Sequence, residues 1–96
     1  MDVTRHIVIR GRVQGVGFRN WTADVAQRLD LRGFVRNRRD GTVEALFRGP
    51  ADIVDEMIEL CREGPALARV DAIIDQPGSG EGLMPAEPGF VMLPTL

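Results

Sequence analysis

Hydrophobic and polar positions alternate along the first part of the chain. In the segment "RHIVIRGRV", Ile7, Ile9 and Val13 share one parity, and Arg10 and Arg12 share the other. Successive side chains of a strand point to opposite faces, so this pattern predicts a half-buried β-strand. We therefore expect the chain to open with a strand that turns one face to a core.

The spacing of apolar residues changes to that of a helix after this strand. Apolar side chains recur at intervals of three and four residues, and Thr22 is the one polar interruption; the members are Phe18, Trp21, Val25 and Leu29. This spacing is typical of an amphipathic helix, and Gly33 offers a left-handed residue at its end. The pattern predicts a helix over about residues 18–32.

The middle of the chain predicts a hairpin followed by a second helix. The runs "GFVRN" and "TVEALFR" are rich in β-branched and aromatic residues, and Asp40-Gly41 between them signals a two-residue hairpin turn. Pro50 then stands at the first turn of a helical pattern, acids follow early in it, and Gly64-Pro65 ends it. Cys61 falls on the apolar face of this helix, so we expect a small core residue.

The remaining segments complete a recognisable order of elements. "ARVDAII" predicts a strand, residues 77–89 form a loop rich in glycine and proline, and "FVML" predicts a short last strand. Elements in the order βαββαβ, with an extra strand, can bury their apolar faces when two helices cover one face of a four- to five-stranded antiparallel sheet. We therefore predict a ferredoxin-like α+β fold with a split βαβ arrangement, as a single domain over residues 1–96.

Composition narrows the class of protein. The single Cys61 excludes an intramolecular disulfide, and no apolar run is long enough for a spanning helix or a signal peptide. We expect a cytoplasmic protein with no membrane partner. One histidine and one cysteine are too few for a four-coordinate zinc site, although carboxylates could still hold a hard cation, and we expect no metal.

Charge is distributed unevenly along the chain. Residues 1–48 carry ten arginines and five acids, a balance of +5, whereas the second half carries two arginines and nine acids, a balance of −7, which gives the total of −2. This asymmetry fits an anionic ligand on the first half, and it equally fits a solvated mixed surface. The chain contains no lysine, which excludes a Walker A phosphate loop.

The stretch "GRVQGVGFRN" joins the first strand to the first helix. The glycines of Gly15-Val16-Gly17 allow consecutive N–H groups to converge on one point, and the helix start adds partial positive charge. Arg19 adds a guanidinium whose planar fork can grip two phosphate oxygens. The junction therefore fits an anion site or, alternatively, a merely tight turn. A Rossmann site is excluded because Asn20 stands where a third glycine is needed.

Two separated motifs make this chain resemble the acylphosphatases. "GRVQGVGFR" is followed, 18 residues after its arginine, by the asparagine of "GFVRNRRDGTVEALFRGP", and "VDEMIELCREGPALARVDAI" is similar to the bacterial members. The similarity covers about residues 6–74. It implies a small enzyme that hydrolyses carboxyl-phosphate anhydrides without metal or cofactor. It also implies that Arg19 binds the phosphate, that Asn37 orients the attacking water, and that a phosphate cradle is formed by Gln14, Gly15, Val16, Gly17, Phe18 and Arg19.

The implied roles agree with the chemistry of these residues. An acyl phosphate expels a carboxylate, whose conjugate acid has a pKa of about 4 to 5, so no general acid is needed. Asn37 has the parity of Val35, and a polar group at the end of a strand avoids burial in the core. An asparagine that bonds its own hairpin backbone is the alternative.

The aromatic content of the chain argues against a nucleic-acid-binding function. A nucleic-acid-binding module needs exposed aromatics for base stacking, and this chain has only Trp21 and four phenylalanines, so no nucleic acid is expected. His6 is interpreted as a surface strand residue. We expect a monomer with a small acyl phosphate as substrate and inorganic phosphate as product or inhibitor. A non-catalytic phosphate-binding module remains the alternative function.

Overall fold

Five strands and two α-helices make up the chain, which a computed structural model describes over residues 1–96. The strands are β1 (Asp2–Arg12), β2 (Arg32–Asn37), β3 (Val43–Pro50), β4 (Arg69–Asp75) and β5 (Phe90–Met92). The helices are α1 (Phe18–Arg28) and α2 (Ala51–Glu63), and a 3₁₀ turn spans Glu81–Leu83. The predicted order of elements is confirmed.

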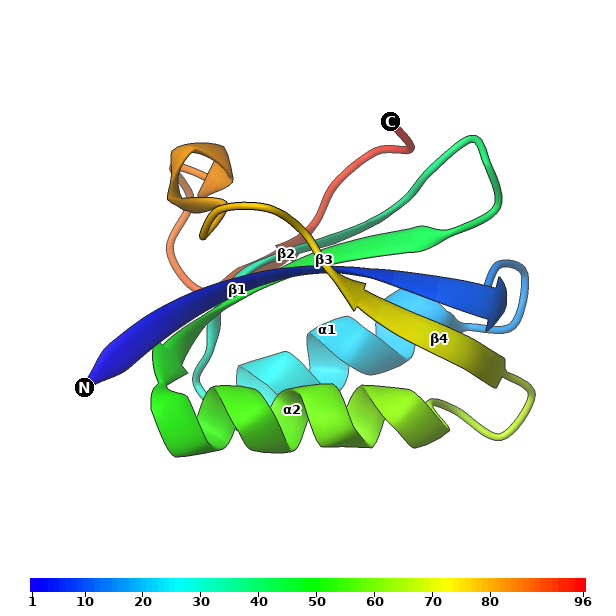
Figure 1. Cartoon of the computed structure of the whole chain (residues 1–96), viewed down its shortest axis with the longest axis horizontal. Coiled ribbons are helices and arrows are strands. Elements are labelled where there is room, and N and C mark those ends of the chain that lie inside the picture. The colour runs from blue at the N-terminus through cyan, green and yellow to red at the C-terminus, as the bar shows by residue number, and fades with distance from the viewer.

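The strands form one sheet in the order β4-β1-β3-β2-β5. Both helices cover one face, and the segment with the 3₁₀ turn lies over the other (Figure 1). Strands β1 to β4 pair antiparallel as predicted, but β5 runs parallel to β2, so the sheet is mixed. After β4, at one edge of the sheet, residues 76–89 form a crossing segment over the face that has no helices, which we call the open face. At the opposite edge the chain continues as β5, which runs beside β2 and parallel to it.

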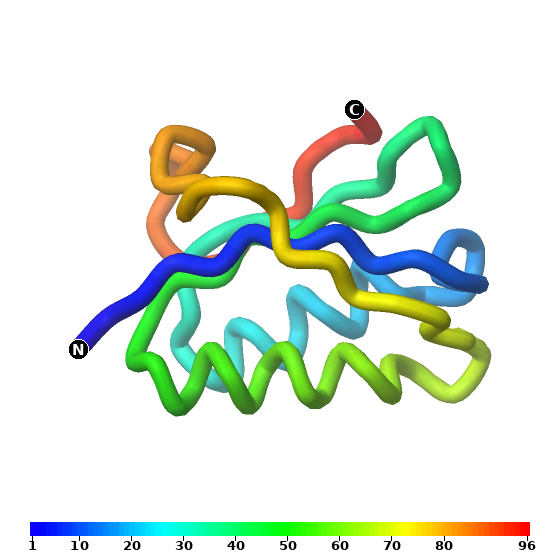
Figure 2. The backbone as a smooth tube through the Cα atoms, viewed as in Figure 1, coloured from blue at the N-terminus to red at the C-terminus, as the bar shows by residue number.

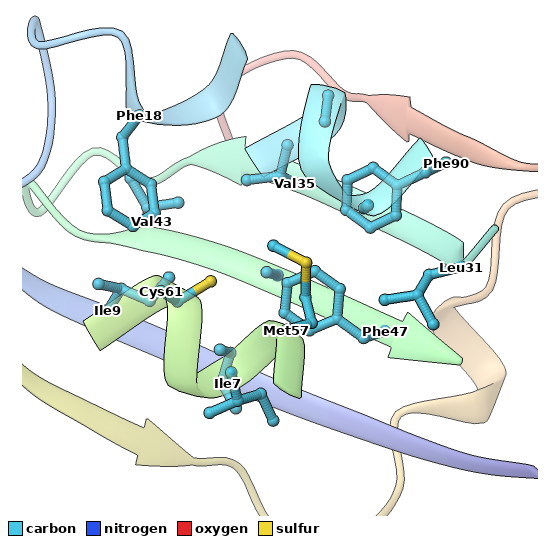
Figure 3. Packing of buried hydrophobic residues seen from close by; sticks show 14 of the residues in the cluster. Ile7, Ile9, Phe18, Leu31, Val35, Val43, Phe47, Met57, Cys61 and Phe90 are labelled. Carbon is cyan, nitrogen blue, oxygen red and sulfur yellow. The ribbon is translucent and has the colours of Figure 1, made fainter. Parts of the chain in front are cut away.

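The core lies between the helices and the sheet. Figure 3 shows the strand residues Ile7, Ile9, Val35, Val43 and Phe47 facing Phe18 of α1 and Met57 and Cys61 of α2. The rings of Phe47 and Phe90 stack with centroids 5.5 Å apart, which fastens β5 to the middle of the sheet. Each fully buried large apolar side chain stabilises the fold by about 1.5 to 3 kcal/mol. The parity predicted for β1 is confirmed.

Helix α1 ends at Arg28, earlier than predicted. Asp30 adopts a left-handed φ of 57°, its N–H donates to the carbonyl of Gln27, and the N–H of Leu31 donates to the carbonyl of Ala26. These two bonds form a Schellman cap, so an aspartate ends the helix. Gly33 lies instead inside β2, where a Cβ would come within 1.7 Å of the Leu46 carbonyl oxygen.

The buried stripe of α1 is made of smaller side chains than predicted. The helix buries Phe18, Thr22, Ala23 and Ala26, whereas the predicted core members Trp21, Val25 and Leu29 are only partly buried. Small side chains let a helix approach a sheet closely, and the larger ones then cover the flanks of the contact. The predicted position of Cys61 in the core is confirmed.

The hairpin between β2 and β3 has three residues in its turn, so the predicted two-residue turn is wrong. The N–H of Arg38 donates to the carbonyl of Thr42, the N–H of Gly41 donates to the carbonyl of Arg38, and only Gly41 has a positive φ, of 93°. A two-residue type I′ turn needs positive φ at both central residues. The φ of Asp40 is not positive, and its carboxylate accepts hydrogen bonds from the hydroxyl and the N–H of Thr42, which lower its pKa.

The open face of the sheet carries a charged cluster. Glu44 is 3% exposed, and it accepts a bond of 2.7 Å from Arg36 and lies 2.6 Å from His6. Burial raises the pKa of Glu44, but the bonds from Arg36 and His6 outweigh it and hold the pKa below its ordinary value. The cluster therefore stabilises the fold above the ordinary carboxyl range, and this contribution is lost as pH falls through the lowered pKa.

The prediction that His6 is a surface residue is wrong. Its side chain is 12% exposed, because the crossing segment lies directly over it: a Cβ at Gly80 would meet His6 at 2.9 Å. The pattern of residues along β1 gives no indication of this cover, which comes from residues far away in the sequence. His6 therefore belongs to the internal cluster around Glu44.

Candidate active site

A single pocket opens at the end of the sheet where β1 and β2 finish. Its volume is about 140 Å³, and its lining comes from the β1–α1 loop, the first turn of α1 and the last residue of β2: Val13, Gly15, Gly17, Phe18, Arg19, Asn20 and Asn37. Figure 2 shows this loop and the β2–β3 hairpin side by side at the same end of the molecule. The pocket therefore brings together both motifs that the sequence singled out.

The backbone of the β1–α1 loop presents a row of free donors. No N–H group from residue 14 to residue 20 donates a hydrogen bond within the chain, and the first such bond runs from Trp21 N–H to the Gly17 carbonyl. Gly15 and Gly17 have φ of 73° and 81°, and a Cβ at either would meet no atom within 4 Å. Glycine is thus required by conformation and not by space, and we call the loop with its free N–H groups the nest, a backbone arrangement that is suited to anions.

Arg19 supplies a full positive charge to this nest. Its guanidinium has no carboxylate partner, whereas six of the twelve arginines form ion pairs: Arg5, Arg28, Arg36, Arg48, Arg62 and Arg69. No acidic residue stands in the first turn of α1, so nothing neutralises the partial positive charge of the helix start. The local electrostatics favour an anionic ligand.

Asn37, the last residue of β2, brings the second sequence motif to the pocket. It pairs with Val43 across the strands and shares the side of the buried Val35, which places its carboxamide in the pocket. Its Oδ1 is buried and has no hydrogen-bond partner. A buried acceptor without a partner costs about 1 to 3 kcal/mol, so this oxygen indicates that a water or ligand belongs beside it.

The alternative role considered for Asn37, a hydrogen bond to the hairpin backbone, belongs to a different residue. Gln14, not Asn37, bonds the hairpin backbone, through Nε2 to the carbonyls of Arg38 at 2.7 Å and Thr42 at 2.8 Å. The Gln14 side chain is therefore not part of the pocket lining, and only its backbone N–H remains free. Val16 also lies outside the lining and packs partly against the core.

Two lining residues were missed in the sequence. Val13 and Asn20 both border the pocket, although neither was selected as a site residue. The signal for Asn20 was its place in the first turn of the predicted helix, where side chains flank the free N–H groups. Val13 was assigned only to the buried face of β1, and it closes the pocket floor from there.

The pocket offers donors and amides but no acid, base or nucleophile. No carboxylate, imidazole or thiol is among its lining residues. Burial raises the pKa of Cys61 to about 12, so its thiol stays protonated inside the core. His6 belongs to the opposite face of the sheet, where it contacts Glu44. Chemistry at this site must therefore depend on positioning and on electrostatic stabilisation.

Comparison with known proteins agrees with this geometry. No helix of the chain has the length and apolarity that crossing a membrane requires. The solved acylphosphatase from Coxiella burnetii superposes with a TM-score of 0.83 at 28% identity, over 96% of this chain and 93% of that one. The acylphosphatase from Bacillus subtilis superposes with a TM-score of 0.79 at 29% identity, over 97% and 99%.

Sequence relatives are closer than these structures. The acylphosphatase of Nitrobacter hamburgensis is 60% identical over 97 residues, which cover 99% of this chain and 98% of the relative. The family model described as Acylphosphatase matches residues 5–84. The resemblance drawn from the two motifs is thereby confirmed, and the chain belongs to the acylphosphatase family of hydrolases.

Proposed function

We propose that this enzyme cleaves the carboxyl-phosphate bond of acyl phosphates to a carboxylate and inorganic phosphate, without a metal ion. One observation carries the proposal: the free N–H groups of the β1–α1 loop, the unpaired guanidinium of Arg19 and the unpartnered Oδ1 of Asn37 belong to one pocket. Together they offer a binding place for a phosphoryl group and an acceptor for a water beside it.

The phosphoryl group binds in the nest. Its oxygens accept hydrogen bonds from the loop N–H groups and from the fork of Arg19, beside the positive end of α1. The pocket volume of about 140 Å³ is below the range of about 300 to 1,000 Å³ that is usual for complete small ligands. The pocket therefore encloses the phosphoryl end and leaves the acyl group outside, which predicts tolerance of many acyl groups.

The bond change needs only one placed water. Asn37 Oδ1 accepts a hydrogen bond from the water, which directs a lone pair of the water oxygen at phosphorus. A P–O bond forms to water while the P–O bond to the acyl oxygen breaks, and the electron pair leaves with the carboxylate. An amide is not a strong base, so the water proton passes to a phosphate oxygen or to solvent.

Arg19 and the N–H groups provide the charge stabilisation that a metal ion provides in other phosphoryl-transfer enzymes. As negative charge redistributes over the phosphoryl oxygens, fixed donors stabilise it without having to reorganise. The lining holds no carboxylate that would bind a hard cation. Activity is therefore expected to persist undiminished in EDTA, and its loss there would contradict this part of the proposal.

The test is hydrolysis of benzoyl phosphate by wild type, Arg19→Ala and Asn37→Ala. Losing the guanidinium is expected to lower kcat/KM by at least about 10³-fold. Losing the carboxamide is expected to lower kcat by about 10²-fold and to leave phosphate affinity within about threefold, because Asn37 acts on the water. Phosphate affinity is read from the fluorescence of Trp21, whose N–H bonds the Gly17 carbonyl of the loop.

The matched control is Arg28→Ala, on the same helix. Arg28 is exposed and pairs with Asp24, so its loss is expected to leave both constants unchanged. Undiminished turnover in both site variants would show that the assigned roles are wrong. Phosphate binding by a wild-type protein with no measurable turnover would identify a non-catalytic phosphate-binding module instead.

A further inference from the structure

We infer that Gln14 is a positioning residue whose side chain fastens the phosphate-binding loop to the hairpin that carries Asn37. The inference rests on the roles proposed above for Arg19 and Asn37. Gln14 was predicted only as a member of the phosphate cradle, and the inference adds a separate role for its side chain, which is directed at the hairpin. Its consequence is that Gln14 sets the distance between the bound phosphoryl group and the attacking water.

The Gln14 carboxamide makes the only hydrogen bonds between the loop and the hairpin. Its two N–H bonds reach the carbonyls of Arg38 at 2.7 Å and Thr42 at 2.8 Å, and both contacts are partly buried. No other hydrogen bond or ion pair joins residues 13–17 to residues 37–42. A single side chain thus links the two segments.

The sheet itself does not provide this link. Pairing of β1 with β3 ends at Ile9 opposite Val43, and beyond that point β1 pairs only with β4 on its other side. Pairing of β2 with β3 ends at Asn37 opposite Val43. The loop and the hairpin therefore extend past the last shared rung of the sheet, and the Gln14 amide bridges the gap between them.

Removing the Gln14 donors leaves the hairpin intact. The Arg38 carbonyl still accepts the N–H of Gly41 at 3.1 Å, and the Thr42 carbonyl still accepts the N–H of Arg38 at 2.9 Å. Neither carbonyl becomes an unsatisfied acceptor. We therefore expect the loop and the hairpin to change their position relative to each other while both segments stay folded.

Phosphate binding and attack by water depend to different degrees on the relative position of the loop and the hairpin. The nest and Arg19 belong to the loop and α1, so phosphate affinity does not require the hairpin. Attack requires a water held by Asn37 to lie in line with a phosphoryl group held by the loop. A misplacement of about 1 Å in such a geometry costs about 10²-fold in rate. Loss of the link should therefore lower kcat and spare affinity.

The experiment compares Gln14→Met, which keeps the length of the side chain and removes its donors, with wild type. With benzoyl phosphate we expect kcat to fall by about 10- to 100-fold while the fluorescence-derived Kd for inorganic phosphate stays within about threefold. In the Asn37→Ala background the same substitution is expected to cost less than about threefold, because the water it positions is already lost. Gln14→Asn, which is too short to reach both carbonyls, should reproduce the loss in kcat.

The matched control is Gln27→Met. Gln27 also donates from its side chain to a distant backbone carbonyl, that of Phe90 at 3.1 Å, but it lies outside the pocket. It should lose about 1 kcal/mol of stability and keep its kinetic constants. Equal stability losses in Gln14→Met and Gln27→Met with unequal losses in kcat would separate positioning from general structural support.

Three results would overturn the inference. An unchanged kcat in Gln14→Met would show a link without a catalytic consequence. Weakened phosphate binding with kcat retained would show that the side chain contacts phosphate. Equal losses in the wild-type and Asn37→Ala backgrounds would show that Gln14 does not act through Asn37. The proposed function fails separately, through absent wild-type turnover or through unchanged turnover in Arg19→Ala and Asn37→Ala.

Discussion

The fold contains two strand-to-helix junctions that have the same topology and opposite chemistry. Between β1 and α1 the chain makes a loop with left-handed Gly15 and Gly17 and leaves a row of N–H groups free. Between β3 and α2 there is no loop: Pro50 caps the helix, Asp52 stands in its first turn, and the N–H of Ala51 donates to the Met1 carbonyl. The two junctions lie at opposite ends of the sheet (Figure 1).

The difference shows what a helix start needs in order to bind an anion. Both helices have the positive end of a dipole at this position. At α2 an internal carboxylate and a neighbouring carbonyl already use it, and no pocket forms there. At α1 the donors are free, no carboxylate competes, and Arg19 is unpaired. The glycine loop, the unpaired Arg19 and the absence of a carboxylate, and not the helix dipole alone, therefore distinguish the β1–α1 junction.

The largest expected effect comes from giving α1 the carboxylate that α2 has. In Asn20→Asp a negative charge lines the pocket that is proposed to bind phosphate. A like charge about 6 Å from bound phosphate, at an effective dielectric constant of about 20, costs about 3 kcal/mol, so phosphate affinity should fall about 100-fold. The same charge at the helix start should raise the free energy of unfolding by about 0.3 to 1 kcal/mol.

Asn20→Ala is the control for this change. It removes the amide without adding charge, and phosphate affinity should stay within about threefold of wild type. Calorimetry of phosphate binding together with urea unfolding measures both effects. If Asn20→Asp and Asn20→Ala weakened phosphate binding equally, charge would not explain the difference between the two junctions.

A smaller effect is expected from Gly17→Ala, which acts on backbone conformation. Gly17 has a left-handed φ of 81°, and an alanine there costs about 1 to 2 kcal/mol although the space is open. Stability should fall by this amount, and phosphate affinity should fall with it because the nest distorts. Gly82→Ala, also in open space but without a positive φ, should cost neither stability nor affinity, as chemical denaturation would show.

The smallest effect is expected at the second junction. Asp52→Asn removes the carboxylate from the first turn of α2, which should lower the free energy of unfolding by about 0.3 to 1 kcal/mol. Turnover should not change, since α2 borders no pocket. Thermal unfolding at low and high salt measures the effect, and a difference from wild type that survives high salt would contradict a dipole origin.

Sequence periodicity was sufficient for most of the fold, and the two motifs singled out Arg19 and Asn37, which the structure brings to one pocket. Alternation located β1, helical spacing located α1 and α2, and the parity of Asn37 with Val35 placed its amide on the pocket side of the sheet. Arg19 was found because it follows glycines that free the helix start. Each of these inferences uses residues that are close together in the sequence.

Several features that were mispredicted or missed depend on distant residues, whereas the end of α1 and the hairpin turn depend on local ones. The parallel pairing of β5 depends on where a long crossing segment leads, which no local period encodes. The burial of His6 depends on the segment around Gly80, and the contacts of Gln14 depend on Arg38 and Thr42, which lie 24 and 28 residues away in the chain. The end of α1 at Asp30 was missed because glycine is the more usual left-handed residue.

The donors of the nest belong to the main chain, and this determines how the site responds to mutation. Exchanging the side chain of Val16 or Phe18 leaves every peptide N–H in place, so substitutions at these positions should alter packing and spare the proposed contacts to phosphate. Proline is the exception, because it has no N–H to offer. On the proposed roles, sensitivity to mutation should therefore be concentrated in the two left-handed glycines, in Gln14, in Arg19 and in Asn37, whereas the side chain of Val16 should be free to vary.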